Sequence, residues 1–243
     1  MRANLPSPAG RLVPSATGNG LLARLPRKDR ERFVRACESV ELVFNETIAE
    51  PGDTMHHIHF PIGGFVSLLA VMPGGVPIEV ALVGNEGMVG IPLALGVEKT
   101  AGRLLVQGHG TALRMTAAKF RRELKASPAL RATLDRYIHA CLGQLAQTAG
   151  CNRFHVVEER LARWMLMTAD RAHSATFHIT HEFLAMMLGV RRVGVTKAAS
   201  ALQRRKLISY SRGDIRIRDR AGLEAAACGC YKTDLAIYER AFN

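Results

Sequence analysis

The chain has 243 residues, and 48% of them are hydrophobic, which is enough for one large domain or two domains of ordinary size. Its 33 Lys and Arg outnumber its 21 Asp and Glu, and the resulting net charge of +12 favours an acidic partner, above all nucleic acid. We expect a cytoplasmic protein, because we find neither a signal peptide nor a continuous apolar span, and five cysteines mostly far apart do not fit a disulfide framework.

The chain is expected to open with a tail and a surface helix. Residues 1–19 are rich in Pro, Gly, Ser and Ala, a composition that predicts a flexible tail. Between Leu21 and Cys37 a mixed-charge run follows Pro26, a residue suited to a helix start. The run therefore predicts a solvated helix at the entrance of a first folded domain, residues 20–126.

Short β-forming runs fill most of this first domain, from Val40 to about Met115. Turn signals such as Pro51-Gly52-Asp53 and Pro73-Gly74-Gly75 separate them. Many short strands at such spacing predict an antiparallel β-roll or jelly roll, so the fold class is α+β.

Three histidines are the one enzyme-like feature of this region. His57 and His59 would lie on one face of a strand, as the metal-binding pair of cupin enzymes does, with His56 beside them. The cupin pattern then needs a Glu where this chain has Gly63 and Gly64. Ordinary surface or packing histidines are therefore favoured, and a cupin-like, metal-dependent β-barrel enzyme stays open as an alternative.

A long helix is predicted over residues 127–150. Ser127 suits the N-cap and Pro128 the first helical position. Residues recurring at coiled-coil spacing predict a dimer seam, although a helix buried within one chain remains an alternative. The seam residues are Leu134, Ile138, Cys141, Leu145 and Thr148, while Leu130, Tyr137 and Leu142 are expected to face the barrel. Gly150 to Val157 is the expected hinge.

The last domain, residues 151–243, is predicted to begin with a helix from Glu158 to Ala169. A second helix should start after the N-cap Thr180 and end at Gly189, and a third should run from about Arg191 to Arg204. The spacing of Ala185, Gly189 and Val195 is typical of a DNA-binding helix-turn-helix, although a packed helical hairpin is the alternative.

Two strand-like runs around Ser211-Arg212-Gly213-Asp214 predict a wing after this motif. The segment from Arg191 to Arg220 contains ten Lys or Arg and only two Asp. This excess of positive charge suits a phosphate backbone. Double-stranded DNA is therefore the expected partner. The predicted DNA-binding residues are Arg191, Arg192, Val193, Gly194, Thr196, Lys197, Ser200 and Arg212.

After the wing, a helix or a pair of helices is expected from Asp219 to Arg240. Cys228-Gly229-Cys230 lies within it. Two cysteines with one residue between them, and with no second pair or nearby histidine in the sequence, are poor zinc spacing. We therefore predict no metal site.

These features together resemble the Crp/Fnr family of bacterial transcription regulators. Besides the helix-turn-helix, the resemblance rests on Phe120-Arg121, Ser127-Pro128 and Glu159-Arg160-Leu161-Ala162. It implies a cyclic-nucleotide-binding-like sensor domain, a dimerisation helix and a winged helix-turn-helix. It also implies a homodimer on a palindromic operator, with RNA polymerase as a further candidate partner.

The family's nucleotide pocket is altered in this chain. Gly87 and Met88 match the family's Gly-Glu pair, and Lys99-Thr100, with Arg103 nearby, match its Arg-Ser pair. Because Met cannot accept a ribose hydrogen bond, cyclic AMP is not expected to bind by the usual contacts. One N-terminal cysteine cannot hold an iron–sulfur cluster, and no haem ligand pair is identified.

No cofactor is therefore predicted, and the expectation is a non-enzymatic regulator with a degenerate effector pocket. The alternatives are the cupin-like enzyme and a small-molecule or cyclic-dinucleotide sensor that acts through protein contacts.

Overall fold

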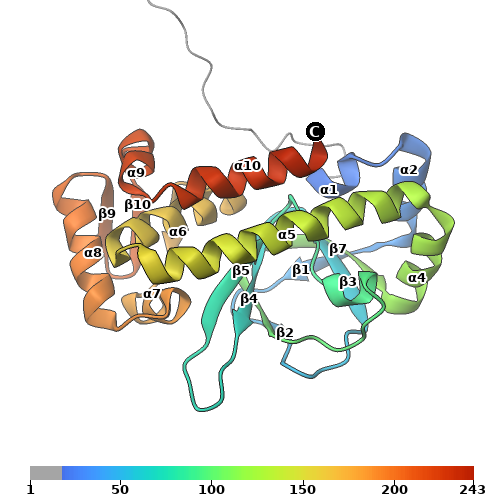
Figure 1. Ribbon diagram of the computed structural model, residues 1–243, viewed down its shortest axis with the longest axis horizontal. Coiled ribbons are helices and arrows are strands. Elements are labelled where there is room, and N and C mark those ends of the chain that lie inside the picture. The colour runs from blue at the N-terminus through green and yellow to red at the C-terminus, as the bar shows by residue number, and fades with distance from the viewer. Residues whose placement is uncertain (1–17) are drawn as a thin grey trace, which may run out of the picture.

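The computed structural model of the chain describes residues 18–243 (Figure 1). The predicted tail, residues 1–19, lies outside these residues apart from Gly18 and Asn19. Asn19 is fully buried, and its side-chain amide donates hydrogen bonds to the carbonyls of Pro61 and Gly87 at 2.9 and 3.0 Å. Its side-chain oxygen caps the first helix by accepting from Leu22 N–H, so Asn19 is part of the folded domain.

Two antiparallel sheets form the predicted β-roll. The first has the strand order β1 (Glu38–Leu42), β7 (Gly110–Thr116) and β3 (His57–Pro61). The second has the order β2 (Thr47–Ala49), β6 (Arg103–Gly108), β4 (Phe65–Ala70) and β5 (Ile78–Val83). Apart from the three-residue β2, which was not predicted, these strands overlap the β-forming runs predicted between Val40 and about Met115.

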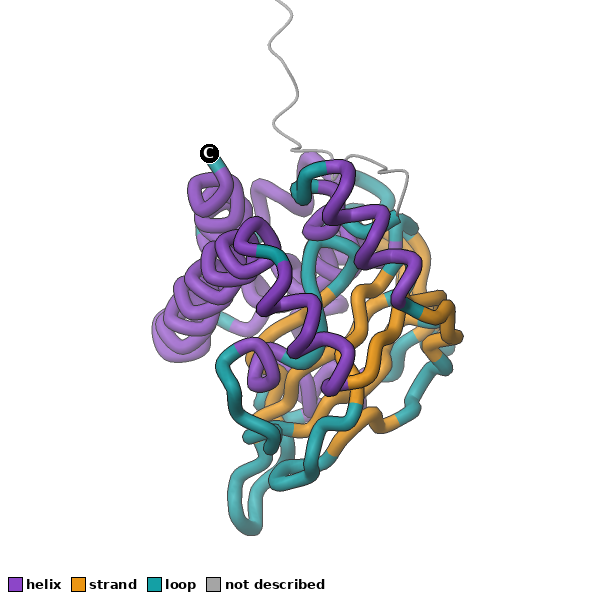
Figure 2. The backbone as a smooth tube through the Cα atoms, turned by 90° about the vertical axis from the view of Figure 1, so that its right-hand side faces the viewer, coloured by secondary structure: helices purple, strands orange, loops and turns teal. Residues whose placement is uncertain are grey.

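Helices close the β-roll on one side, and Figure 2 shows them gathered against the strands. Those of the first domain are α1 (Gly20–Ala23), α2 (Arg27–Ala36), α3 (Ile91–Ala94) and α4 (Ala117–Ala126). Phe33 of α2 meets Phe60 of β3 edge-on, with 5.3 Å between ring centroids, and Phe120 of α4 is fully buried in the same core. The expected surface helix is thus anchored by an aromatic pair.

The predicted long helix, α5 (Pro128–Phe154), crosses the whole molecule from the β-roll to the last domain (Figure 1). Ser127 caps it, since its hydroxyl accepts from Leu130 N–H at 3.1 Å. The hinge predicted from Gly150 to Val157 is too long, because α5 continues through Gly150 and breaks only at His155 and Val156. An interior glycine costs a helix only about 1 kcal/mol, and the adjacent Cys151 is fully buried, so the helix can continue through Gly150.

The predicted seam of α5 lies inside its own chain. Leu134 is fully buried, and Ile138 and Cys141 pack against the core of the β-roll. Leu142, which was expected to face the barrel, is 61% exposed. Leu130 and Tyr137 face the β-roll as predicted. The buried face also holds Leu134, Ile138 and Cys141, which were predicted for the seam, while Leu142 lies outside it. The stripe that faces solvent has a 3-4 spacing of its own, formed by Ala132, Asp135, His139, Leu142, Ala146 and Ala149.

The last domain contains the predicted helices and wing. Its helices are α6 (Val157–Ala172), α7 (His181–Leu188), α8 (Arg192–Arg204), α9 (Arg220–Ala226) and α10 (Cys230–Phe242). Its sheet has the order β8 (Thr176–His178), β10 (Asp214–Ile217) and β9 (Ile208–Ser211), of which β8 was not predicted. None of the helices among residues 18–243 is long and apolar enough to cross a membrane.

The terminal helix α10 runs back along α5 to the β-roll (Figure 1). The hydroxyl of Tyr238 donates to the Glu86 carbonyl at 2.5 Å, and the guanidinium of Arg24 lies 4.1 Å from the ring centroid of Phe242. At the other end of α10, Asp234 forms a buried ion pair with Arg163 of α6. Helix α10 therefore contacts both domains.

The two domains also meet around Glu79 of β5, which is buried. Trp164 of α6 donates its indole N–H to one carboxylate oxygen at 2.8 Å, and the Ser67 hydroxyl donates to the other at 2.7 Å. Burial is the main cause that raises the pKa of Glu79 to about 7, although these hydrogen bonds and the charges of Arg171 and Arg163 act against it. Glu79 therefore links β5 and β4 of the β-roll to α6 of the last domain.

Candidate nucleic-acid interface

The turn between α7 and α8 has the geometry that the sequence predicts. The hydroxyl of Thr180 accepts from Phe183 N–H at 3.2 Å and caps α7. Gly189 ends that helix with a φ of +61°, and Val190 N–H donates back to the Ala185 carbonyl at 3.0 Å. A Cβ on Gly189 would lie 2.5 Å from the end of the Ile78 side chain, so the positive φ favours glycine here and a larger residue would also make Ile78 shift.

Helix α8 packs one face and exposes the other. Its inward residues, Val195, Ala199 and Leu202, are buried as predicted, and Ala198 joins them. These contacts orient the helix. Its opposite face presents Arg191, Arg192, Val193, Thr196, Lys197 and Ser200 to solvent, with Gly194 half-buried between them.

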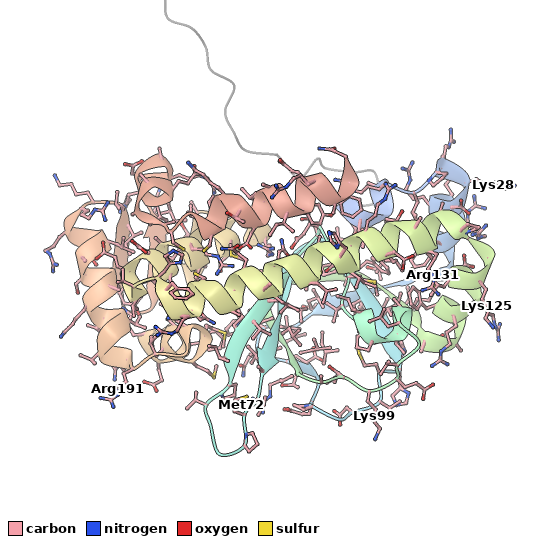
Figure 3. The ribbon with its side chains drawn as sticks, viewed as in Figure 1. Lys28, Met72, Lys99, Lys125, Arg131 and Arg191 are labelled. Carbon is pink, nitrogen blue, oxygen red and sulfur yellow. The ribbon has the colours of Figure 1, made fainter. Side chains whose placement is uncertain are left out.

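The charges on this exposed face are available to a partner. Arg192 lies 4.0 Å from Glu182, and the two side chains are 71% and 79% exposed, so this contact is weak. Figure 3 shows Arg191 at the end of the molecule that α7 and α8 form, away from Lys28 and Lys125. The helix thus presents a cationic surface with an exposed valine, Val193, within it.

The wing is a tight hairpin with Arg212 at its tip. Ser211 pairs with Asp214, which leaves Arg212 and Gly213 as the two loop residues. Their φ values of +51° and +93° are those of a type I′ turn, the turn that matches the twist of a hairpin. Asp214 lies 2.8 Å from His178 Nδ1, whereas Arg212 is exposed. The wing therefore adds one exposed cation, Arg212, to those of α8.

One structural residue of the motif was missed. The His181 ring stacks on Tyr210 with 4.2 Å between centroids, and its Nδ1 lies 3.0 Å from the Thr196 hydroxyl. That hydroxyl donates to the Arg192 carbonyl at 3.1 Å, so Thr196 also joins α8 to the start of α7. Burial, and then the charge of Arg192, lower the pKa of His181 and favour its neutral form. No local pattern in the sequence indicates this stack. His181 begins α7 and Tyr210 lies in β9, so the whole of α8 separates them in the chain.

Two of the predicted pocket residues lie against α5. The hydroxyl of Tyr137 donates to the Met88 carbonyl at 3.3 Å, and a Cβ on Gly87 would lie 2.3 Å from that hydroxyl oxygen. The Met88 side chain is buried in the core of the β-roll. This position therefore offers an apolar side chain and not a carboxylate.

The other predicted pocket residues make contacts elsewhere. Lys99 is exposed, as Figure 3 shows, and forms an isolated β-bridge with Thr54. The hydroxyl of Thr100 donates to the Gly102 carbonyl at 2.9 Å, and Arg103 pairs with Glu50 at 2.9 Å. The contacts of Lys99, Thr100 and Arg103 are thus with residues other than Gly87 and Met88.

The histidines of β3 do not assemble an enzyme-like metal site. His59 is buried, and burial is the main cause that lowers its pKa to about 4. His57 lies beside it with 6.5 Å between ring centroids. Within residues 18–243, neither His56, His57 nor His59 belongs to a group of three potential ligands. The packing interpretation is therefore favoured over the cupin-like one.

Comparison with known proteins agrees with this geometry. Residues 159–226 match the family model of the Crp-like helix-turn-helix domain. No curated protein sequence matches the chain.

Several solved structures share the fold over most of the chain. The c-di-GMP responsive global regulator CLP of Xanthomonas campestris is 15% identical with a TM-score of 0.65, and the match covers 79% of this chain and 99% of CLP. FixK2 of Bradyrhizobium japonicum is 13% identical with a TM-score of 0.67, covering 79% and 98%. The CRP/FNR family regulator TTHA1359 of Thermus thermophilus is 21% identical with a TM-score of 0.64, covering 78% and 98%. At these identities the likeness concerns the fold.

Proposed function

We propose that this chain, which has the Crp/Fnr fold and a Crp-like helix-turn-helix domain, is a transcription regulator that binds a palindromic DNA site as a homodimer. The observation that carries the proposal is the exposed face of α8, with three cations beside the cation of the wing tip. A helix of this kind fits the major groove, where base edges differ between all four base pairs.

The side chains of α8 divide by their position on the helix. Arg192, Val193 and Lys197 project from its N-terminal, outward part, which reaches base edges when such a helix enters the groove. An arginine donates two hydrogen bonds to guanine, and a valine contacts the methyl group of thymine. Arg191 and Arg212 flank this set and suit phosphate oxygens, which position the protein without reading sequence. Gly194, Thr196 and Ser200 line the same face.

Dimerisation through the solvent-facing stripe of α5 completes the proposal. Leu142 is its large apolar residue, and the small side chains of Ala132, Ala146 and Ala149 allow two helices to approach closely. The 3-4 spacing keeps one stripe facing a partner along the helix. Two copies related by a twofold axis would present two α8 helices to successive major grooves, as a palindromic operator requires.

The effector site is proposed to be degenerate. Met88 is buried and apolar where a ribose-binding carboxylate would be needed, and Tyr137 packs directly on Gly87. The contacts of Thr100 and Arg103 with Gly102 and Glu50 support the same conclusion.

Selection of bound sequences from a random DNA pool tests the proposal. The wild type should enrich an inverted repeat whose half-sites lie about 10 base pairs apart, one turn of the double helix. Substituting Arg191, Arg192 and Lys197 together by Ala should abolish the enrichment. A control variant with Lys28, Arg122 and Lys125 of α2 and α4 replaced by Ala should keep the enrichment. It is matched in charge, because both variants have a net charge of +9 (+12 less 3). Equal loss in both variants, or no enriched sequence with the wild type, would contradict the proposal.

A further inference from the structure

Three of the five cysteines and one histidine meet where α5, α6 and α10 converge. Cys151 lies in the last turn of α5, His155 caps that helix, Cys228 lies between α9 and α10, and Cys230 begins α10. Their four potential ligand atoms all lie within 4.8 Å of one another. The sequence has no histidine close to Cys228-Gly229-Cys230, but the fold brings His155 to them. The residues that complete the cluster come from the end of α5, far earlier in the chain.

We propose that Cys151, His155, Cys228 and Cys230 bind one tetrahedral zinc ion that joins α10 to the end of α5. Among residues 18–243 this is the one group of three or more clustered His, Cys, Asp or Glu side chains. Three thiolates and one imidazole form a closed, four-coordinate set, which is typical of structural zinc sites.

The spacing of the ligand atoms agrees with such an ion. Zn–S bonds of about 2.3 Å and a Zn–N bond of about 2.0 Å place two sulfurs of a tetrahedron about 3.8 Å apart and a sulfur and a nitrogen about 3.5 Å apart. The Sγ atoms of Cys151 and Cys228 are 3.5 Å apart, and Cys230 Sγ lies 3.4 Å from His155 Nδ1. The cluster is already close to the size that the ion requires.

The surroundings of the cluster also suit a thiolate-rich site. Cys151, Cys228 and Cys230 are buried and pack as a small group apart from the two main cores. Gln147 donates a side-chain N–H to Cys230 Sγ at 2.9 Å, the kind of hydrogen bond that orients a metal ligand. Arg160 of α6 interacts electrostatically with Cys151 and Cys228, so it offsets the net charge of −1 that a zinc ion and three thiolates would have, whereas Arg163 is already paired with Asp234.

The position of the site gives it a structural role. Cys151 lies in the last turn of α5, and His155 follows directly as its C-cap, so both are at the same end of that helix. Cys228 and Cys230 lie on the other side of the junction, at the start of the helix that runs back to the β-roll. The ion would hold the end of α5, the corner before α6 and the start of α10 together, and so fix the root of the helix-turn-helix domain. When zinc binds, the three thiols release three protons to the solvent.

Metal analysis of the full chain, purified after growth with added Zn²⁺, tests this proposal. We expect about one zinc per chain after exhaustive dialysis. The variant with Cys228→Ser and Cys230→Ser should retain less than about a tenth of that amount, whereas the control with Cys37→Ser and Cys141→Ser should retain all of it, because neither control residue is in the cluster. Less than about a tenth of an ion per wild-type chain, or equal zinc in both variants, would overturn the site.

A second measurement does not depend on how the variants fold. Metal-free wild-type protein titrated with Co²⁺ should develop the intense visible bands of tetrahedral cobalt and the charge-transfer band of cobalt–thiolate bonds, saturating at about one equivalent. Added Zn²⁺ should bleach these bands and raise the thermal unfolding midpoint. The absence of thiolate bands in a folded, fully reduced chain would contradict the proposal. Neither measurement involves DNA, so failure here leaves the proposed regulator untouched.

Discussion

Replacing Glu79 by Gln should change how the stability of the protein depends on pH. The carboxyl of Glu79 is buried between the β-roll and α6, and its pKa is raised from 4.5 to about 7, mainly by burial. An acid with a raised pKa in the folded state stabilises the fold fully only below its unfolded pKa, and this contribution is lost as the pH rises through the folded value. Glu79 therefore makes the protein less stable at pH 8 than at pH 5.

The size of the effect follows from the shift in pKa. At about 1.4 kcal/mol per pH unit, a shift from 4.5 to about 7 corresponds to a free energy on the order of 3 kcal/mol. Most of it, about 2 to 3 kcal/mol, is lost between pH 5 and pH 8.5. Gln has nearly the same shape and can still accept from the Trp164 indole, but it stays neutral. Its loss of an acceptor for Ser67 and Gln107 adds a cost that does not change with pH.

Urea unfolding of both proteins at fixed concentration between pH 5 and pH 8.5 measures the effect. The free energy of unfolding of Glu79→Gln minus that of the wild type should rise by about 2 to 3 kcal/mol over this range. The control Glu98→Gln, at a side chain 60% exposed, should show a difference that stays constant. A constant difference for Glu79→Gln as well would refute the inference that this carboxyl is buried at the domain contact.

Three further predictions concern the dimer, the turn and the effector. Leu142→Asp, at the exposed stripe of α5, should weaken the dimer at least about tenfold by sedimentation without changing the monomer fold, and a wild type that is monomeric at micromolar concentration would contradict the proposed interface. Gly189→Ala should lower the free energy of unfolding by about 2 to 4 kcal/mol, because its φ is positive and the new Cβ meets Ile78, whereas a loss below about 1 kcal/mol would show that the turn relaxes. Cyclic AMP at millimolar concentration should change neither the melting temperature nor DNA affinity, and micromolar binding by calorimetry would show that Met88 does not block the ligand.

The elements of this fold follow largely from local signals in the sequence. The N-cap Ser127, the positive φ at Gly189 and the two-residue turn at Arg212 and Gly213 depend on neighbours only a few positions away, and each is where the sequence predicts it. The short strands β2 and β8 were missed because three residues are too few to show a period.

Contacts between distant segments could not be predicted in the same way. Periodicity detects that α5 has two faces, but the face that is buried depends on the β-roll and on α10, which lie elsewhere in the chain. Leu134 and Leu142 were therefore assigned to the wrong sides. The cluster of Cys151, His155, Cys228 and Cys230 was missed for the same reason, since the two pairs meet only because the fold places the start of α10 against the end of α5.

The claim that α8 reads DNA is tested most directly by repeating the binding-site selection with single variants. Arg192→Ala should relax the preference at one base pair of each half-site and cost about 1 to 3 kcal/mol there. Arg212→Ala should weaken all sequences alike and lower the slope of the salt dependence by about one per subunit, while Arg204→Ala, at the far end of α8, should leave the selected motif unchanged. If Arg192→Ala leaves both the motif and its affinity unchanged, α8 is not the reading helix.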